Sequence, residues 1–254
     1  MSTLQATIAA LIFATGGRVL GAEMSVLICP SGPTVPENLL RVELRFSAPL
    51  WPQLRMDQVA LTDATGTEIK DPFLDLGLPS SDGRSMIILF HPARVKTGVG
   101  ANLALGRALH VGDTVTLTIE HPALAKPVRK SWLITEPDTK SPQPAHWTFA
   151  PPQSGSRSPL LVHLDKPISL SAEHLIAIRG PDGSRLAGDA RLENGETEWC
   201  FTPERPWHEG AYAVVTHPDL EDFAGNRPGA PFETTVAGQV RDGQGTVQPF
   251  QLTN

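Results

Sequence analysis

The same pattern of short segments occurs twice along the chain, in the same order. Residues 59–69 correspond to residues 176–186 at an offset of 117, and residues 44–50 correspond to residues 162–168 at an offset of 118. Two further pairs follow, 89–94 with 200–205 and 121–124 with 217–220. Because a repeat marks copies of one structural unit, the sequence predicts two domains of the same fold.

Within each copy, apolar residues alternate with polar ones. Val42, Leu44 and Phe46 alternate with charged residues, and Leu160 and Val162 repeat this pattern in the second copy. A period of two is typical of a strand with one face on a core and the other in water. Turn-forming clusters separate these runs. The sequence therefore predicts an all-β protein made of two tandem immunoglobulin-like β-sandwich domains.

Local composition predicts the boundaries between the parts of the chain. Residues 136–145 hold three prolines and no apolar anchor, which is typical of a semi-rigid linker. An insertion in the first copy replaces what is a tight turn at residues 207–210 in the second, and it is either a functional loop or a packing flap. The predicted parts are a signal peptide (1–22), domain 1 (23–136, insertion 96–110), a Pro-rich linker (137–146), domain 2 (147–236) and a flexible tail (237–254).

The N-terminal residues predict export to the periplasm or the medium. Residues 6–14 are apolar over a signal-peptide length, and small residues ending at Ala22 suit cleavage. No Lys or Arg precedes the apolar run, and the alternative is a short N-terminal helix of the folded protein. No other apolar stretch approaches membrane length, so no membrane span is expected. The net charge of −6 leaves no basic surface for a nucleic acid, so no nucleic-acid partner is expected.

The two cysteines, Cys29 and Cys200, allow two interpretations. In an oxidising compartment they would pair and fix the angle between the domains. The alternative is two independent thiols, because a bridge needs Cα atoms within about 7 Å and the sequence supplies no distance. Cys200 lies between Trp199 and Phe201, so on a strand it faces away from those two rings.

Several motifs follow one another in the order of a known domain type. The second copy has Asp165–Ile168, Pro181–Gly183, Phe201–Pro203, Gly210–Tyr212 and Asp222–Asn226; the first has Phe46–Pro49, Asp63–Gly66 and Phe90–Pro92 but no Asp-x-x-Gly-Asn turn. This order resembles the bacterial Ig-like domain of the surface-layer (SbsA) type, and the chain is similar to a group of uncharacterised exported bacterial proteins. The resemblance covers most of residues 35–236. It implies a β-sandwich outside the cytoplasm, used as a spacer or adhesion module, and implies no activity.

No catalytic residue, metal ligand or cofactor site is predicted. The sequence has no G-x-S-x-G elbow, no P-loop and no G-x-G-x-x-G. One group of side chains could in principle bind a metal: His208, His217, Asp219, Glu221 and Asp222. Their spacing favours a solvated loop instead, closed by a turn in which Asp222 caps backbone N–H groups and Gly225 has a positive φ.

Aromatic residues are the best candidates for binding. Trp51 and Trp207 each lie beside a proline in a predicted turn, where an exposed ring could stack on a sugar or anchor a partner. The alternative is that each ring covers one end of a core. The function predicted first is a non-catalytic exported envelope protein, an Ig-like interaction or scaffolding module with an unknown protein or glycan partner. The second is a glycan- or peptide-binding module using the exposed tryptophans and the 96–110 loop, and a hydrolase is a distant third.

Overall fold

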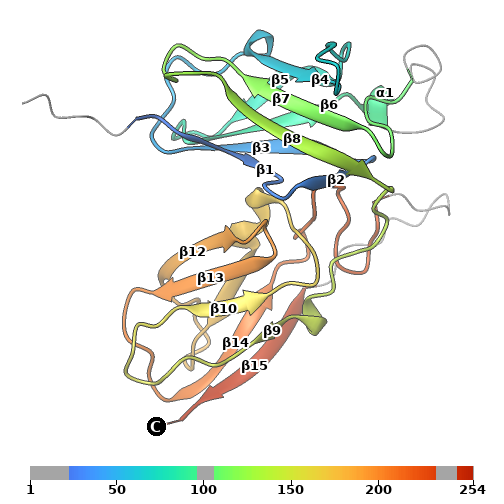
Figure 1. The fold of residues 1–254 in the computed structure, drawn as a ribbon. Helices are drawn as coiled ribbons and strands as arrows, with labels where there is room; N and C mark the ends of the chain where they lie inside the picture. The colour runs from blue at the N-terminus through green and yellow to red at the C-terminus, as the bar shows by residue number, and fades with distance from the viewer. Residues whose placement is uncertain (1–22, 96–105, 233–244, 254) are drawn as a thin grey trace, which may run out of the picture.

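The computed structural model describes residues 23–95, 106–232 and 245–253, which form two β-sandwiches joined by one connection (Figure 1). The predicted signal peptide and residues 96–105 of the predicted insertion lie outside these residues. In Figure 1 the first domain runs from blue to green and the second from yellow to red. The short helices are η1 (Met56–Gln58), α1 (Pro92–Val95), η2 (Pro144–His146) and η3 (Leu170–Leu175).

The first domain consists of two four-stranded sheets. One has the order β1 (Val26–Cys29), β3 (Arg41–Phe46), β6 (Ser85–Phe90), β5 (Phe73–Pro79). The other has the order β2 (Thr34–Pro36), β8 (Val128–Thr135), β7 (Thr114–Ile119), β4 (Val59–Thr62). Neighbouring strands are antiparallel except β2 and β8, which are parallel.

The second domain consists of a four-stranded and a three-stranded sheet. The larger has the order β12 (Gly188–Glu193), β13 (Glu198–Pro203), β10 (Leu160–His163), β9 (Thr148–Phe149). The smaller has the order β11 (Ile176–Arg179), β14 (Gly210–Thr216), β15 (Thr246–Leu252). All pairs in this domain are antiparallel.

Both domains have the strand order of an immunoglobulin fold. If the strands of each domain are lettered A to G along the chain, with β2 of the first domain counted as A′, one sheet of each has the order A-B-E-D. The other sheet of each contains C, F and G as neighbours, and in the first domain A′ lies beside G. The repeated segments occupy equivalent strands, because residues 44 and 162 lie on the B strands and residues 59 and 176 begin the C strands. The predicted fold class, two tandem Ig-like sandwiches, is confirmed.

The alternating residues supply the two hydrophobic cores. Val42, Leu44 and Phe46 are buried in the first, and Leu160 and Val162 in the second. Aromatic rings fill much of the second core, where Trp199 and Phe201 stack with ring centroids 5.6 Å apart. Tyr212, early on the F strand, donates its hydroxyl hydrogen to the carbonyl of His208 at 3.1 Å, as in the tyrosine corner of Ig domains.

The predicted flexible tail contains the last strand of the second domain. β15 pairs with β14 along its whole length, from Gly210 opposite Leu252 to Thr216 opposite Thr246. Its buried side chains, Phe250 and Leu252, alternate with the exposed Pro249 and Gln251. The prediction of a loose tail over 237–254 is therefore wrong for residues 246–252, and domain 2 extends beyond residue 236.

The described end of the predicted insertion packs against the first domain. Ala108 and Leu109 are buried in its core. Ala108 donates its backbone N–H to the carbonyl of Arg94 at 3.0 Å, and Arg107 forms an ion pair with Glu37 at 2.7 Å. Residues 106–110 therefore serve packing.

Candidate functional site

The connection between the domains is held from both sides at Asp138. Asn38 of the first domain accepts the Asp138 backbone N–H at 2.8 Å and donates its side-chain amide to the Asp138 carbonyl at 2.9 Å. Asn226 of the second domain donates to the same carbonyl at 3.0 Å. One residue of the connection is thus held by an asparagine from each domain.

Lys166 adds a charged contact at the same place. Its ammonium group donates to the carboxylates of Asp138 and Asp222 and to the carbonyl of Lys140. Three acceptors use all three of its N–H donors. The side chain is only 13% exposed. Lys166 therefore links the connection, residues 138–140, to the loop after β14.

The loop after β14 carries the Asp-x-x-Gly-Asn motif and packs on the first domain. The Asp222 carboxylate accepts the backbone N–H groups of Ala224 and Asn226, each at 2.9 Å, and Gly225 has a φ of +80°. The predicted capping turn is confirmed. Phe223 is buried in the core of the first domain, and its carbonyl accepts the N–H of Leu40 at 3.0 Å.

The expectation of a solvated loop is wrong at this turn. Asp222 and Asn226 are each 1% exposed, because the first domain and the connection cover them. Burial raises the pKa of Asp222, while Lys166 and the hydrogen bonds to the carboxylate act in the opposite direction. The positive φ of Gly225 favours glycine, and a Cβ atom there would lie 2.6 Å from Leu40 Cδ1, so the Leu40 side chain would have to shift.

Glu43 makes a second carboxylate contact between the domains. Its oxygens accept the backbone N–H and the hydroxyl of Ser171, in η3, each at 2.9 Å. Glu43 is 2% exposed, and burial raises its pKa against the lowering effect of the Ser171 hydrogen bonds. The sheet pattern places Glu43 on the outer face of β3, and the second domain covers that face.

Two ion pairs flank this contact. Arg45 donates to Glu173 at 2.9 Å, and the other Glu173 oxygen accepts the backbone N–H of Leu192 at 2.6 Å. Arg41 pairs with Glu221. Glu173 is 3% exposed, so the Arg45 guanidinium and a backbone N–H compensate a buried charge.

Glu196 makes a further contact, with the end of the first strand of the first domain. It is 3% exposed, accepts the Ser31 backbone N–H at 2.9 Å and places its carboxylate near the Cys29 thiol. Burial first, and then the Glu196 carboxylate, raise the pKa of Cys29 far above its ordinary value. The thiol is therefore protonated and unreactive at neutral pH.

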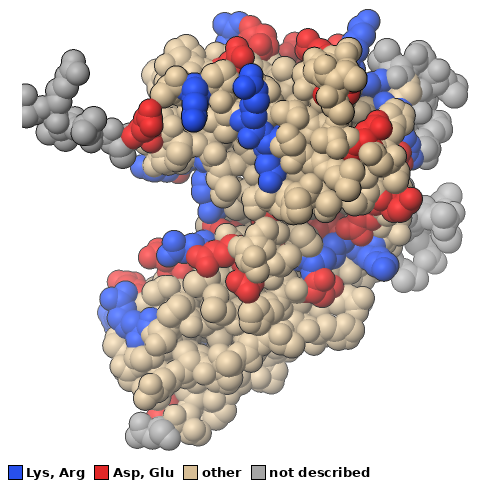
Figure 2. All heavy atoms as spheres, viewed as in Figure 1, with Lys and Arg blue, Asp and Glu red and all other residues tan. Residues whose placement is uncertain are grey.

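Together these contacts form one surface, here called the domain junction and defined by Glu43, Asp138, Lys166, Glu173, Glu196 and Asp222. Figure 2 shows acidic and basic side chains gathered along the line where the domains meet. Leu170 and Phe223 extend the core of the first domain into the second. Buried charges held by specific donors are compatible with one relative orientation, since any other would leave them unpaired.

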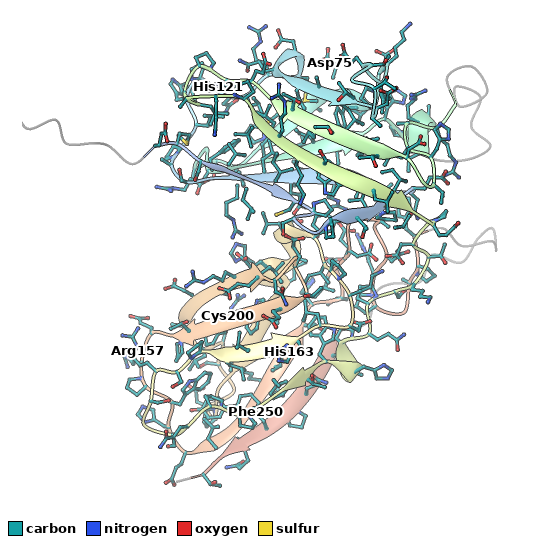
Figure 3. All side chains as sticks on the ribbon, in the orientation of Figure 1. Asp75, His121, Arg157, His163, Cys200 and Phe250 are labelled. Carbon is teal, nitrogen blue, oxygen red and sulfur yellow. The ribbon has the colours of Figure 1, made fainter. Side chains whose placement is uncertain are left out.

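Of the two interpretations of the cysteines, the structure shows the independent thiols and not the bridge. Cys29 and Cys200 are both buried free thiols. Cys29 contacts Glu196 in the turn before β13, whereas Cys200 lies within β13 opposite Leu161, on the face away from Trp199 and Phe201 (Figure 3). The outward direction predicted for Cys200 is correct, but the first domain meets the turn at Glu196 rather than the strand.

The two tryptophans predicted as binding residues have opposite environments. Trp51 is 78% exposed. Trp207 is 1% exposed, packs against Phe201 and Tyr212, and donates its indole N–H to the Ser158 carbonyl at 2.8 Å. Trp207 is therefore part of the second core, and its assignment as an exposed binding residue is wrong.

Across residues 23–95, 106–232 and 245–253, no group of three or more His, Cys, Asp or Glu side chains is arranged to hold a metal ion. The same residues include no helix long and apolar enough to cross a membrane. His217 and Asp219 lie 3.5 Å apart on the surface, and Asp219 also pairs with Arg227 at 3.0 Å.

No family model matches the chain, and no curated protein matches it. Among solved structures, a chimeric titin Z1Z2 carrying a decorin peptide is 11% identical with a TM-score of 0.28, and the match covers 92% of this chain and 100% of that one. A titin Ig tandem is 13% identical with a TM-score of 0.24 over 84% and 87% of the two chains. Native alpha-2-macroglobulin from Escherichia coli is 12% identical with a TM-score of 0.28 over 91% and 72%. At these TM-scores the likenesses carry no argument, and the Ig-like assignment rests on the strand order.

Proposed function

We propose that this chain is a non-catalytic interaction or scaffolding protein that holds two Ig-like domains in one fixed orientation. The observation that carries the proposal is the domain junction, where Glu43, Glu173 and Glu196 each accept hydrogen bonds from the opposite domain while almost fully buried. Tandem domains usually move relative to one another unless their interface is extensive. Here the shared core at Leu170 and Phe223 also opposes separation.

Small-angle X-ray scattering on the purified protein tests this rigidity. We expect a single arrangement of the two domains to reproduce the whole profile, because separating them would leave buried carboxylates without donors. Raising the salt concentration should leave the profile unchanged, since buried pairs are screened much less than exposed ones. A profile that requires several interdomain orientations would refute a fixed scaffold.

We also propose that the protein works outside the cytoplasm, on a protein or glycan partner of the cell envelope. The support is the apolar run at residues 6–14, the small residues ending at Ala22 and the resemblance to surface-layer Ig-like domains. N-terminal sequencing of protein recovered from the periplasm or the medium should begin near Glu23. A cytoplasmic protein that keeps Met1 would contradict export.

A further inference from the structure

An exposed tryptophan is held on a fixed loop at one end of the first domain. Trp51 lies between Leu50 and Leu54, which are 2% and 5% exposed and belong to the first core. Leu50 donates its N–H to the Gly83 carbonyl at 2.9 Å, which ties this loop to the loop between β5 and β6. The two buried leucines fix the backbone on either side of the indole, so binding a ligand there would cost little ordering entropy.

A cavity of about 390 Å³ opens beside this loop. Its polar lining comes from η1 and from the loop after β7: Asp57, Gln58, Glu120, His121 and Lys126. His121 Nε2 lies 2.9 Å from the Pro52 carbonyl, and Glu120 donates its N–H to the Gln58 carbonyl at 2.9 Å. These contacts join the cavity to the residue next to Trp51, and Figure 3 shows His121 at this end of the domain.

The fold places these segments together. They are the B–C and F–G loops of the first sandwich, which meet at one end of an Ig domain and form the antigen-binding end in variable domains. That parallel is one of fold position alone. The support from this structure is the exposed indole, the anchored loop and the adjoining cavity.

The chemistry of the lining favours an uncharged ligand rich in hydroxyl groups. Asp57 and Glu120 are balanced in charge by Arg55 and Lys126, and all four side chains are exposed. Carboxylate and amide oxygens accept hydrogen bonds, which sugar hydroxyls donate but proline-rich peptides largely cannot, because proline lacks an N–H. An indole face also offers an apolar platform for the C–H face of a sugar ring.

We propose that residues 47–58 and 120–127 form a binding site for a neutral glycan built of pyranose rings. Trp51 stacks on one ring, and the Glu120 carboxylate binds hydroxyl groups in the adjoining cavity, together with the Asp57 and Gln58 side chains, whose oxygens also accept hydrogen bonds from Arg55. The site goes beyond the scaffold function and does not depend on the domain junction, whose residues it does not include. It would give a fixed two-domain protein a ligand at its first domain.

Titration of the protein with cellohexaose, chitohexaose, maltohexaose and mannohexaose, followed by calorimetry and tryptophan fluorescence, tests the proposal. At least one of these oligosaccharides should bind at millimolar concentration or below. Trp51→Ala should weaken that binding about tenfold or more, and Glu120→Ala should weaken it as well. Leu161→Ala is the matched control, because it removes an exposed apolar side chain from the second domain, and it should bind as the unchanged protein does.

Calorimetry is needed because Trp51→Ala removes the fluorescent reporter together with the platform. The variant should keep its melting temperature, since the side chain is 78% exposed. Three outcomes would overturn the proposal: none of the four oligosaccharides binds, Trp51→Ala binds as tightly as the unchanged protein, or a proline-rich peptide binds through Trp51 while the oligosaccharides do not. None of them would alter the scattering profile, so failure here is distinct from failure of the rigid scaffold.

Discussion

Replacing Phe201 with alanine should lower the free energy of unfolding by about 3–5 kcal/mol. The ring is 4% exposed, stacks on Trp199 at 5.6 Å and contacts Trp207 edge-on at 6.0 Å. Its removal leaves a cavity between rigid aromatic rings, which cannot collapse to fill the space. Urea denaturation followed by far-ultraviolet circular dichroism measures the change.

Leu161→Ala is a suitable control for this experiment. Leu161 lies on the neighbouring strand β10, opposite Cys200, and its side chain is 40% exposed on the other face of the sheet. Its replacement should change the free energy of unfolding by no more than about 0.5 kcal/mol. Equal losses from the two variants would mean that Phe201 does not occupy the core position described.

Lys166→Met should destabilise the domain junction by about 3–5 kcal/mol at neutral pH. Lys166 is the cation that faces both Asp138 and Asp222, and Asp222 is 1% exposed. Methionine fills a similar volume but leaves the Asp222 carboxylate buried without a compensating charge. Urea denaturation and small-angle scattering should show lower stability and a wider range of domain orientations.

The loss of stability caused by Lys166→Met should become smaller as the pH falls. Burial raises the pKa of Asp222 in the folded protein, and Lys166 opposes that rise. Without Lys166 the pKa rises further, so the folded variant takes up a proton more readily than the unfolded chain does, and folding is favoured at acidic pH relative to neutral pH. Protonated Asp222 needs no cation.

Lys140→Met removes the same charge from the same neighbourhood and serves as the control. The Lys140 side chain is exposed, and only its backbone takes part in the junction, through the carbonyl that Lys166 contacts and the N–H that donates to Asp138. Its replacement should cost no more than about 0.5 kcal/mol. The role assigned to Lys166 would be contradicted if Lys166→Met lowered the free energy of unfolding no more than Lys140→Met does. It would also be contradicted if the loss caused by Lys166→Met grew at acidic pH.

The strands could be predicted from the sequence, because each depends on residues close together in the chain. Val42, Leu44 and Phe46 point inward as their alternation predicts. Glu43 has the same pattern as an exposed residue, yet it is buried, because its partner Ser171 lies 128 positions away. The turn at Asp222 was predictable for a similar reason, whereas its burial depends on the first domain.

The error at Trp207 follows from the missed last strand. The Trp207 ring packs edge-on against Phe250, which lies on β15, and their ring centroids are 6.5 Å apart. Because Gly- and Gln-rich residues precede this strand, the sequence predicts a tail that includes its short alternation of apolar and polar residues. Trp207 is therefore predicted to be exposed, since the strand that covers it is not predicted. The sequence left two interpretations of the cysteines open because no local pattern tells which part of β13 or its turn meets β1.

The position of β15 has a consequence for how the chain folds as it is made. The second sandwich lacks one strand of its smaller sheet until residues 246–252 have been synthesised, whereas the strands described for the first sandwich end at residue 135. The loop that seats Phe223 against the first domain lies between β14 and β15. Domains generally fold as units, the N-terminal one first. The first domain therefore folds before the second, and the second domain completes its smaller sheet in contact with the folded first domain.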